Sequence, residues 1–232
     1  MDKTTFMGYK RPYGRVGIRN HVLVLATVGC AAEAARQTAD GIYGAVSFIN
    51  QNGCGESSRN LRRTQDVLVG MAANPNVYGV VAIGLGCEMN RMDGFIKELR
   101  ARTDKPIEGL LIQEEGGTIE TVAKAKKIAR RMVIEASMCR REECDISELM
   151  LGIECGGSDA TSGLVSNPVM GIISDRIIAV HSVTTPSLSA PCRPLINRAN
   201  PFLIRFHIRI PYPLPIYMRI IRPDFHKSMT FK

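Results

Sequence analysis

Three cysteines of the chain lie in glycine-rich segments where a thiol could do chemistry. Cys54 stands in NGCG, Cys87 in GLGC and Cys155 in ECGG. A thiolate can act as a nucleophile or as a ligand for a soft metal ion, although a cysteine that follows a strand often only packs. The absence of any C-x-x-C pair disfavours a zinc finger. Seven cysteines, without the even spacing of a disulfide framework, indicate reduced thiols and a cytoplasmic protein.

Carboxylate side chains accompany these cysteines. Asp and Glu in such loops could hold a divalent metal ion or act as general acids and bases. For Glu88 and Asp159, the alternative is a favourable negative charge at the beginning of a helix. The carboxylates in question are Glu56, Glu88, Glu114, Glu115, Glu154 and Asp159.

A further group of residues is suited to bind an anion. Arg11, Arg15 and Arg19 precede a long apolar run in GYKRPYGRVGIRNH. A guanidinium group can hold a carboxylate through two hydrogen bonds, and a structural or solvated role is the alternative. Glycine-rich loops that lead into helices also suit a carboxylate or a phosphate, because they present backbone N–H groups. The chain has no Walker A lysine pattern and no G-x-G-x-x-G that opens a helix, which argues against nucleotide binding.

The elements that must position these residues alternate between strands and helices. Segments with helical spacing separate the apolar runs, and the last long one starts at Thr118, a suitable N-cap. The alternation predicts an α/β fold with an open, mostly parallel, Rossmann-like sheet and flanking helices. Ligands bind such sheets beyond the carboxyl ends of the strands, where the glycine- and cysteine-rich loops fall. Short apolar runs predict buried strands at residues 21–29, 44–50, 77–86, 106–113 and 147–157.

Composition separates a body from a tail. The chain has 232 residues, of which 45% are hydrophobic and 22% charged, and no apolar run is long enough to span a membrane. The net charge is +8, but residues 177–232 hold eight Lys or Arg against one Asp. The body is therefore nearly neutral, and neither a nucleic acid nor a membrane is indicated as a partner.

The tail differs from the body in other ways. It contains eight of the twelve prolines and no glycine, so neither a long helix nor a central strand is expected there. A basic arm, a Pro-rich interaction segment and out-of-frame translation all fit this composition, and we favour the last. We expect an Arg/Gly-rich lead-in at 1–20, an α/β domain at 21–176 and an irregular Pro/Arg-rich tail at 177–232.

Several motifs together resemble a known family. G-R-x-G-x-R-N precedes the first strand, G-L-G-C-E follows the third, and C-G-G-S-D-x-x-S-G-x-x-x-N-P follows the fifth. In this order and spacing they are similar to the large catalytic portion of the altronate dehydratase/galactarate dehydratase family. The same superfamily includes the large subunit of sulfolactate sulfo-lyase. The resemblance covers roughly residues 8–176.

The resemblance implies a hydro-lyase that removes water from an altronate- or galactarate-like sugar acid and forms a 2-keto-3-deoxy acid. It also implies a divalent metal ion, iron(II) or otherwise manganese(II), that polarises the carboxylate while a base removes the α-proton. On the matching motifs, catalytic roles fall on Cys54, Glu56, Cys87, Glu88 and Asp159, and a metal-ligand role falls on Cys155. Substrate-binding roles fall on Arg15, Arg19, Asn20, Gly156, Gly157 and Ser158.

The chain departs from the family pattern in three places. Family members often carry a histidine-containing stretch before G-C-G, where this chain has INQNGCG, and neither Asn50 nor Asn52 can act as a base. The small N-terminal domain is not seen before the first motif, so we expect a separate small subunit or domain as partner. The resemblance ends near Asp175. A sulfo-lyase and a non-catalytic acid-binding protein stay open as alternatives, as does assembly into a homo-oligomer.

Overall fold

The computed structural model describes residues 5–12, 15–150 and 159–184. It divides into two units, one of residues 7–144 and one that includes residues 145–232 together with the first six residues. The four predicted strands of the first unit are present, and each lies within its predicted range. They are β3 (His21–Ala26), β4 (Ala45–Phe48), β5 (Val77–Gly84) and β6 (Ile107–Leu111).

These four strands form one parallel sheet in the order β4-β3-β5-β6. The central strands β3 and β5 consist almost entirely of buried apolar residues, as expected for strands covered on both faces. Because β3 and β4 are adjacent and parallel, the loops that follow them leave the sheet beside each other. The parallel α/β architecture predicted from the alternating pattern is therefore confirmed.

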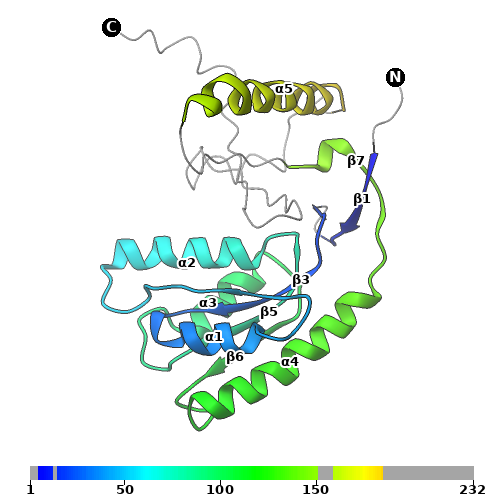
Figure 1. The fold of residues 1–232 in the computed structure, drawn as a ribbon. Coiled ribbons are helices and arrows are strands. Elements are labelled where there is room, and N and C mark those ends of the chain that lie inside the picture. The colour runs from blue at the N-terminus through cyan, green and yellow to red at the C-terminus, as the bar shows by residue number, and fades with distance from the viewer. Residues whose placement is uncertain (1–4, 13–14, 151–158, 185–232) are drawn as a thin grey trace, which may run out of the picture. The chain divides into compact units, whose positions relative to one another are not determined.

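Helices cover both faces of this sheet (Figure 1). Alternate residues of β3 point to opposite faces: Val22 and Val24 pack with apolar residues of α1 and α4, while Leu23 and Leu25 pack with those of α2 and α3. The helices are α1 (Ala32–Ala39), α2 (Ser58–Ala72), α3 (Met92–Arg100) and α4 (Thr118–Met138). The predicted cap of α4 is displaced by one residue, because Gly117, with φ of 107°, is its N-cap and Thr118 is its first helical residue.

The Arg/Gly-rich lead-in contains β1 (Thr5–Lys10) and β2 (Val16–Gly17), which pair in antiparallel orientation. Together with β7 (Glu142–Asp145) they form a second sheet in the order β2-β1-β7. Sequence reasoning missed these strands because they are short and only partly buried, so they carry no clear hydrophobic period.

The second unit departs from the prediction. The chain forms a short 3-10 helix at Ile146–Glu148, where a fifth strand was expected to begin, and the rest of that range, residues 151–158, lies outside the described residues. A π-helical turn at Ser162–Ser166 leads into α5 (Asn167–Thr184). The helix thus continues across the boundary expected between residues 176 and 177. Within the described ranges, no helix is both long and apolar enough to cross a membrane.

Candidate functional site at the carboxyl edge of the sheet

The loops after β3, β4 and β5 are joined directly to one another. The backbone N–H of Gly29 donates to the carbonyl of Asn52 at 3.0 Å, and the N–H of Asn90 donates to the carbonyl of Gly53 at 3.2 Å. Cys30 and Cys54 each follow one of these joined residues, and Cys87 lies in the third loop. All three thiols are exposed. The structure therefore brings the predicted Cys54 and Cys87 loops together at one edge of the sheet.

The carbonyl of Thr27 is the centre of this arrangement. Thr27 is buried at the end of β3, and its carbonyl oxygen accepts hydrogen bonds from Asn50 Nδ2 and Asn90 Nδ2, both at 3.0 Å. Gly53 lies against it: a Cβ at that position would be 2.5 Å from the Thr27 oxygen, and Gly53 has φ of 105°. Both observations require glycine in the N-G-C-G segment. The loops after β3, β4 and β5 are thus held together around the carbonyl oxygen of Thr27.

Glu88 is a buried carboxylate at this edge. It is 6% exposed, its Oε1 accepts from the Thr27 hydroxyl at 3.1 Å, and its Oε2 accepts from the Gly86 N–H at 2.6 Å. The carboxylate occupies the space that a side chain at Gly84 would need. No ion pair to Glu88 is present among the described residues. α3 begins at Met92, and the acidic residue in its first turn is Asp93. Glu88 therefore does not serve as the favourable negative charge at the beginning of this helix.

Glu56 is fixed in a similar way in the neighbouring loop. Its Oε2 accepts from the Gly53 N–H at 2.9 Å, and its Oε1 accepts from the Thr64 hydroxyl at 2.8 Å. Ser57 then caps α2. Glu56 therefore ties the Cys54 loop to α2.

A pocket of about 490 Å³ opens beside these loops. Cys87 and Glu88 line it after β5, and Glu114 and Glu115 line it after β6. Arg91, at the N-cap of α3, is its one basic lining residue and lies 3.4 Å from Asp93. A buried carboxylate, a thiol and a cation therefore meet around one cavity at the edge where ligands bind parallel sheets.

Comparison with known proteins decides which family has this architecture. Residues 8–137 match the family described as D-galactarate dehydratase/altronate hydrolase, second domain, and residues 146–187 match D-galactarate/altronate dehydratase, C-terminal. This chain belongs to that dehydratase family. The resemblance inferred from the motifs is thereby confirmed, and the family match continues past Asp175, where we expected it to end.

Two curated relatives illustrate the range of reactions in the family. The chain is 41% identical to the (2R)-sulfolactate sulfo-lyase subunit beta of Chromohalobacter salexigens over 75% of this chain and 43% of that protein. It is 34% identical to the altronate dehydratase of Escherichia coli over 76% of this chain and 37% of that protein. The chain thus spans about two fifths of the length of these relatives. Both names denote lyases.

The described residues alone do not form a binding site for the metal ion that we expect from the family. Nowhere in the described ranges do three or more His, Cys, Asp or Glu side chains gather as a metal site would require. Both oxygens of Glu88 and both of Glu56 already accept hydrogen bonds within the protein. Cys155, the expected metal ligand, lies outside the described residues. Iron(II) or manganese(II) stays a prediction.

The family motif G-R-x-G-x-R-N lies at the opposite edge of the sheet. Asn20 immediately precedes β3, whose six residues span about 20 Å. Its Oδ1 accepts from Arg11 at 2.7 Å, and its Nδ2 donates to the Ala136 carbonyl in the last turn of α4 at 2.7 Å. The N–H of Arg19 donates to Asn76 Oδ1 at 3.0 Å. The structure therefore does not bring Arg19 and Asn20 together with Cys54, Glu56, Cys87 and Glu88. Arg15 is exposed in the same segment.

Lys105 and Arg11 form a partly buried pair of cations at this amino edge. Lys105 Nζ donates to the carbonyls of Ala72 and Asn74 at the end of α2, and Arg11 Nε donates to the Pro75 carbonyl at 2.9 Å. Burial lowers the pKa of Lys105 to about 7, and the nearby Arg11 charge acts in the same direction. Burial lowers the pKa of Arg11 too. Their hydrogen bonds to backbone carbonyls indicate a structural role.

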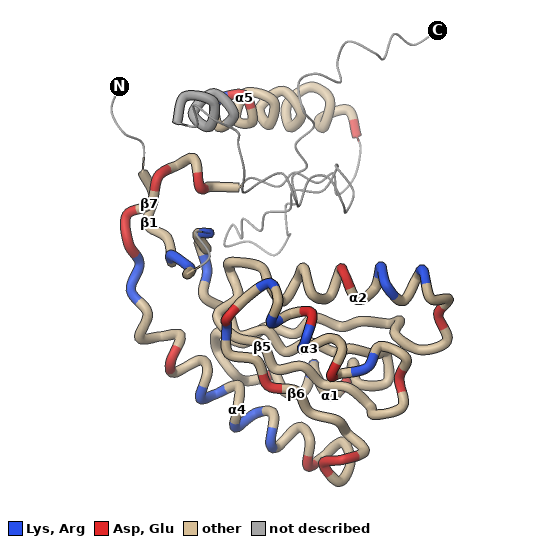
Figure 2. Tube along the Cα trace, turned by 180° about the vertical axis from the view of Figure 1, so that it is seen from behind, with Lys and Arg blue, Asp and Glu red and all other residues tan. Residues whose placement is uncertain are grey.

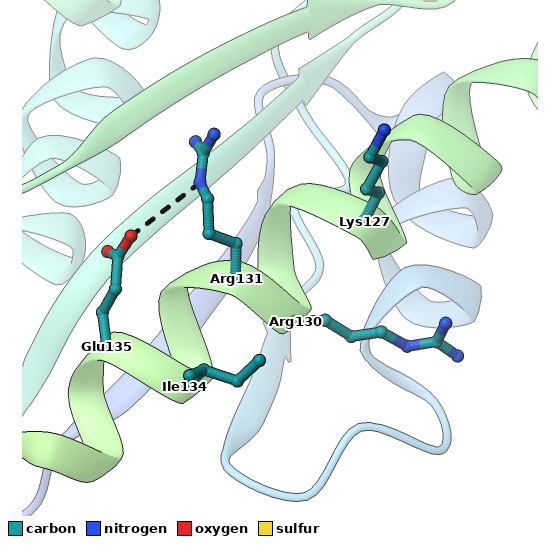
Figure 3. Close-up of a pocket in the computed structure, with 5 residues that line it drawn as sticks. All are labelled: Lys127, Arg130, Arg131, Ile134 and Glu135. Carbon is teal, nitrogen blue, oxygen red and sulfur yellow. Dashed lines mark ion pairs between the residues drawn. The ribbon is translucent and has the colours of Figure 1, made fainter.

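A second pocket, of about 500 Å³, lies along α4 alone (Figure 3). It is lined by Lys127, Arg130, Arg131, Ile134 and Glu135, with Arg131 and Glu135 3.9 Å apart. Lys and Arg are concentrated in the middle of the helix, between residues 124 and 131 (Figure 2). Because every lining residue belongs to one helix surface, and none is a thiol or a buried acid, this pocket lacks the features of a catalytic site.

The remaining predicted site residues fall in or beside the second unit. Asp159 is exposed, and its Oδ1 accepts from the Thr161 hydroxyl at 2.6 Å and from the Ser162 N–H at 2.8 Å. These hydrogen bonds lower the pKa of Asp159. Gly156, Gly157 and Ser158 lie outside the described residues. The catalytic role expected for Asp159 stays a prediction.

Sequence reasoning missed three residues of this site: Thr27, Asn50 and Asn90. Asn50 was considered only as a failed base, yet its amide holds the Thr27 carbonyl. A signal was present, since Thr27 is a polar residue at the end of an apolar run and Asn90 follows Cys87 by three residues. Their connection to one another could not be read from those positions.

Proposed function

We propose that this chain is the catalytic portion of a hydro-lyase that dehydrates an altronate- or galactarate-like sugar acid to a 2-keto-3-deoxy acid. The observation that carries the proposal is Glu88, buried without an ion-pair partner in the described residues, next to Cys87 on the wall of the carboxyl-edge pocket. Membership of the dehydratase family supports the reaction class.

The proposed elimination uses the fixed carboxylate as a proton acceptor. Glu88 takes the proton from C2 of the acid, and the electron pair of that C–H bond forms the C2=C3 double bond. The hydroxyl at C3 leaves as water after it gains a proton, for which the Cys87 thiol is placed on the same wall. The resulting enol tautomerises to the 2-keto acid. Glu56 holds the Cys54 loop in place.

The substrate carboxylate needs positive charge at the same edge. Arg91 lines the pocket at the beginning of α3, where the backbone N–H groups have no side-chain cap. Arg59, Arg62 and Arg63 stand exposed in the first turns of α2, directly after the Glu56 loop. Glu88 and Glu114 oppose an anion in this pocket, whereas Glu115 is paired with Lys124 at 2.7 Å. We further propose that a partner subunit or domain supplies the histidines that this chain lacks directly before Gly53.

The test is product formation by the full chain. The chain is incubated with D-altronate or galactarate, with and without iron(II) or manganese(II), and 2-keto-3-deoxy acid is measured. We expect turnover that increases with a candidate small subunit and falls at least a hundredfold in Glu88→Gln. Glu33→Gln is the matched control, since Glu33 is an exposed acid on α1 that pairs with Arg36. Equal activity in both variants would refute the role of Glu88.

A sulfo-lyase is the second candidate, favoured by the 41% identity to a sulfolactate sulfo-lyase subunit. The same proton abstraction at C2 then expels sulfite from C3 and yields a 2-keto acid after tautomerisation. Release of sulfite from 3-sulfolactate, without product from the sugar acids, would replace the first candidate by this one. Ligand-induced stabilisation without any turnover would leave a non-catalytic acid-binding protein.

A further inference from the structure

The carboxamide of Asn90 presents a hydrogen-bond acceptor that nothing in the described structure satisfies. Asn90 is 2% exposed, and its Nδ2 donates to the Thr27 carbonyl at 3.0 Å. Its Oδ1 is the single buried side-chain oxygen or nitrogen without a hydrogen-bond partner in the described ranges. A buried acceptor in this state costs free energy that a donor would return.

The orientation of this carboxamide is determined by its surroundings. If the amide were reversed, Oδ1 would face the Thr27 carbonyl oxygen, and two acceptors would stand about 3 Å apart. The backbone N–H of Asn90 is also engaged, because it donates to the Gly53 carbonyl. Oδ1 is therefore the one part of Asn90 that is available to a further group.

Asn90 stands in the chain between residues that line the carboxyl-edge pocket, although it is not itself a lining residue. The pocket is lined by Cys87 and Glu88 on one side of Asn90 in the chain and by Arg91 on the other. For a group in the pocket to reach Oδ1, the turn between Cys87 and Arg91 must move, because Asn90 is buried and does not itself line the pocket. A ligand carboxylate is disfavoured there, because both Oδ1 and the Glu88 carboxylate would repel it.

We propose that Asn90 Oδ1 accepts a hydrogen bond from a hydroxyl group of the hydroxy acid bound in this pocket, while Nδ2 remains on Thr27. This inference rests on the proposed function. The hydroxyl at C2 is the donor of choice, because it is shared by sugar acids and sulfolactate and is retained while the group at C3 leaves. Asn90 is thus a substrate-recognition residue.

Asn50 provides a matched control within the same site. It is also buried, at 7% exposed, and its Nδ2 donates to the same Thr27 carbonyl at the same 3.0 Å. Its Oδ1, in contrast, already accepts from the Asn52 N–H at 3.1 Å. Substitution of either residue removes one donor from Thr27, but only Asn90 carries an available acceptor.

The experiment compares acids with and without the hydroxyl. Dissociation constants are measured by calorimetry on the full chain, with 3-sulfolactate against 3-sulfopropanoate and D-altronate against its 2-deoxy analogue. For the wild type, loss of the hydroxyl is expected to weaken binding about tenfold, or about 1.4 kcal/mol. In Asn90→Ala this ratio falls to within about twofold, whereas in Asn50→Ala it stays near tenfold.

A second measurement does not depend on a substituted protein. The side-chain carbonyl resonance of Asn90 in ¹³C-labelled wild-type chain should shift on addition of the hydroxy acid and not of its deoxy analogue. An unchanged resonance, an unchanged ratio in Asn90→Ala, or failure of the wild type to bind either hydroxy acid would each overturn the inference.

The outcomes also separate this inference from the proposed function. Product formation together with an unchanged hydroxyl ratio in Asn90→Ala refutes the role of Asn90 and leaves the lyase intact. Hydroxyl-dependent binding through Asn90 without any product refutes the lyase and leaves the recognition of a hydroxy acid.

Discussion

Gly84 at the end of β5 makes room for the Glu88 carboxylate, and this can be tested by adding one carbon atom. In Gly84→Ala the new Cβ would lie 2.2 Å from Glu88 Oε1 and 2.9 Å from both Thr27 Oγ1 and Leu111 Cδ2. These separations are well inside van der Waals contact. The carboxylate must therefore move, and it then loses its hydrogen bonds to Gly86 and Thr27.

The expected cost follows from these contacts. Overpacking costs about 1–3 kcal/mol, and a lost hydrogen bond to a charged group costs about 1.5–3 kcal/mol. Because the two effects share one cause, we expect Gly84→Ala to lower the free energy of unfolding by about 3 kcal/mol in total. Gly79→Ala is the control: it lies in the same strand, and its Cβ would lie 3.0 Å from Met132 Sδ and 3.3 Å from the Pro106 carbonyl oxygen, both farther than the 2.2 Å contact at Gly84. We expect it to cost less than about 1 kcal/mol.

A double-mutant cycle then isolates the contact between Gly84 and Glu88. Urea unfolding followed by circular dichroism measures the free energy of unfolding for Gly84→Ala, Glu88→Ala and the double variant. Once Glu88 is shortened, the clashing oxygen is absent, so Gly84→Ala should cost only about 1 kcal/mol, a coupling of about 2 kcal/mol. Strictly additive costs would show that the Glu88 carboxylate does not occupy this space.

Three further outcomes are expected. Asn20→Ala should lower the free energy of unfolding by about 1–2 kcal/mol, because it removes the hydrogen bonds that link Arg11 to α4. The affinity of the same variant for the acid is measured as well, since a loss of affinity would indicate the substrate-binding role that the motif predicts. Since the pKa of Lys105 falls from 10.5 to about 7 on folding, the unfolded chain binds more protons between these values. Stability should therefore rise by about 2 kcal/mol from about pH 7 to pH 9 in urea unfolding, and Lys105→Met should remove this rise. Maleimide labelling followed by mass spectrometry should modify Cys54 and Cys87 well before the buried Cys144, and equal rates would contradict the exposed strand-end loops.

The sequence by itself was sufficient for the α/β layout of the first unit. Each buried strand is a short apolar run, and each helix carries its apolar residues at helical spacing, so hydrophobic burial acts within a window of a few residues. The rule that ligands bind at the carboxyl ends of parallel strands then placed the Cys54 and Cys87 loops at one edge. The short strands β1 and β2 escaped prediction because partly buried strands of a second sheet leave no such pattern.

Only the tertiary structure decided how that edge is held together. The hydrogen bonds that join Thr27 to Asn50, Glu88 and Asn90 connect residues 23, 61 and 63 positions apart in the chain. A hydrogen bond depends on two atoms meeting at about 3 Å, and local sequence carries no record of a partner so distant. For the same reason, the motif that ends in Asn20 was assigned to the substrate, while the fold places it beyond the opposite end of β3, against Arg11 and the last turn of α4.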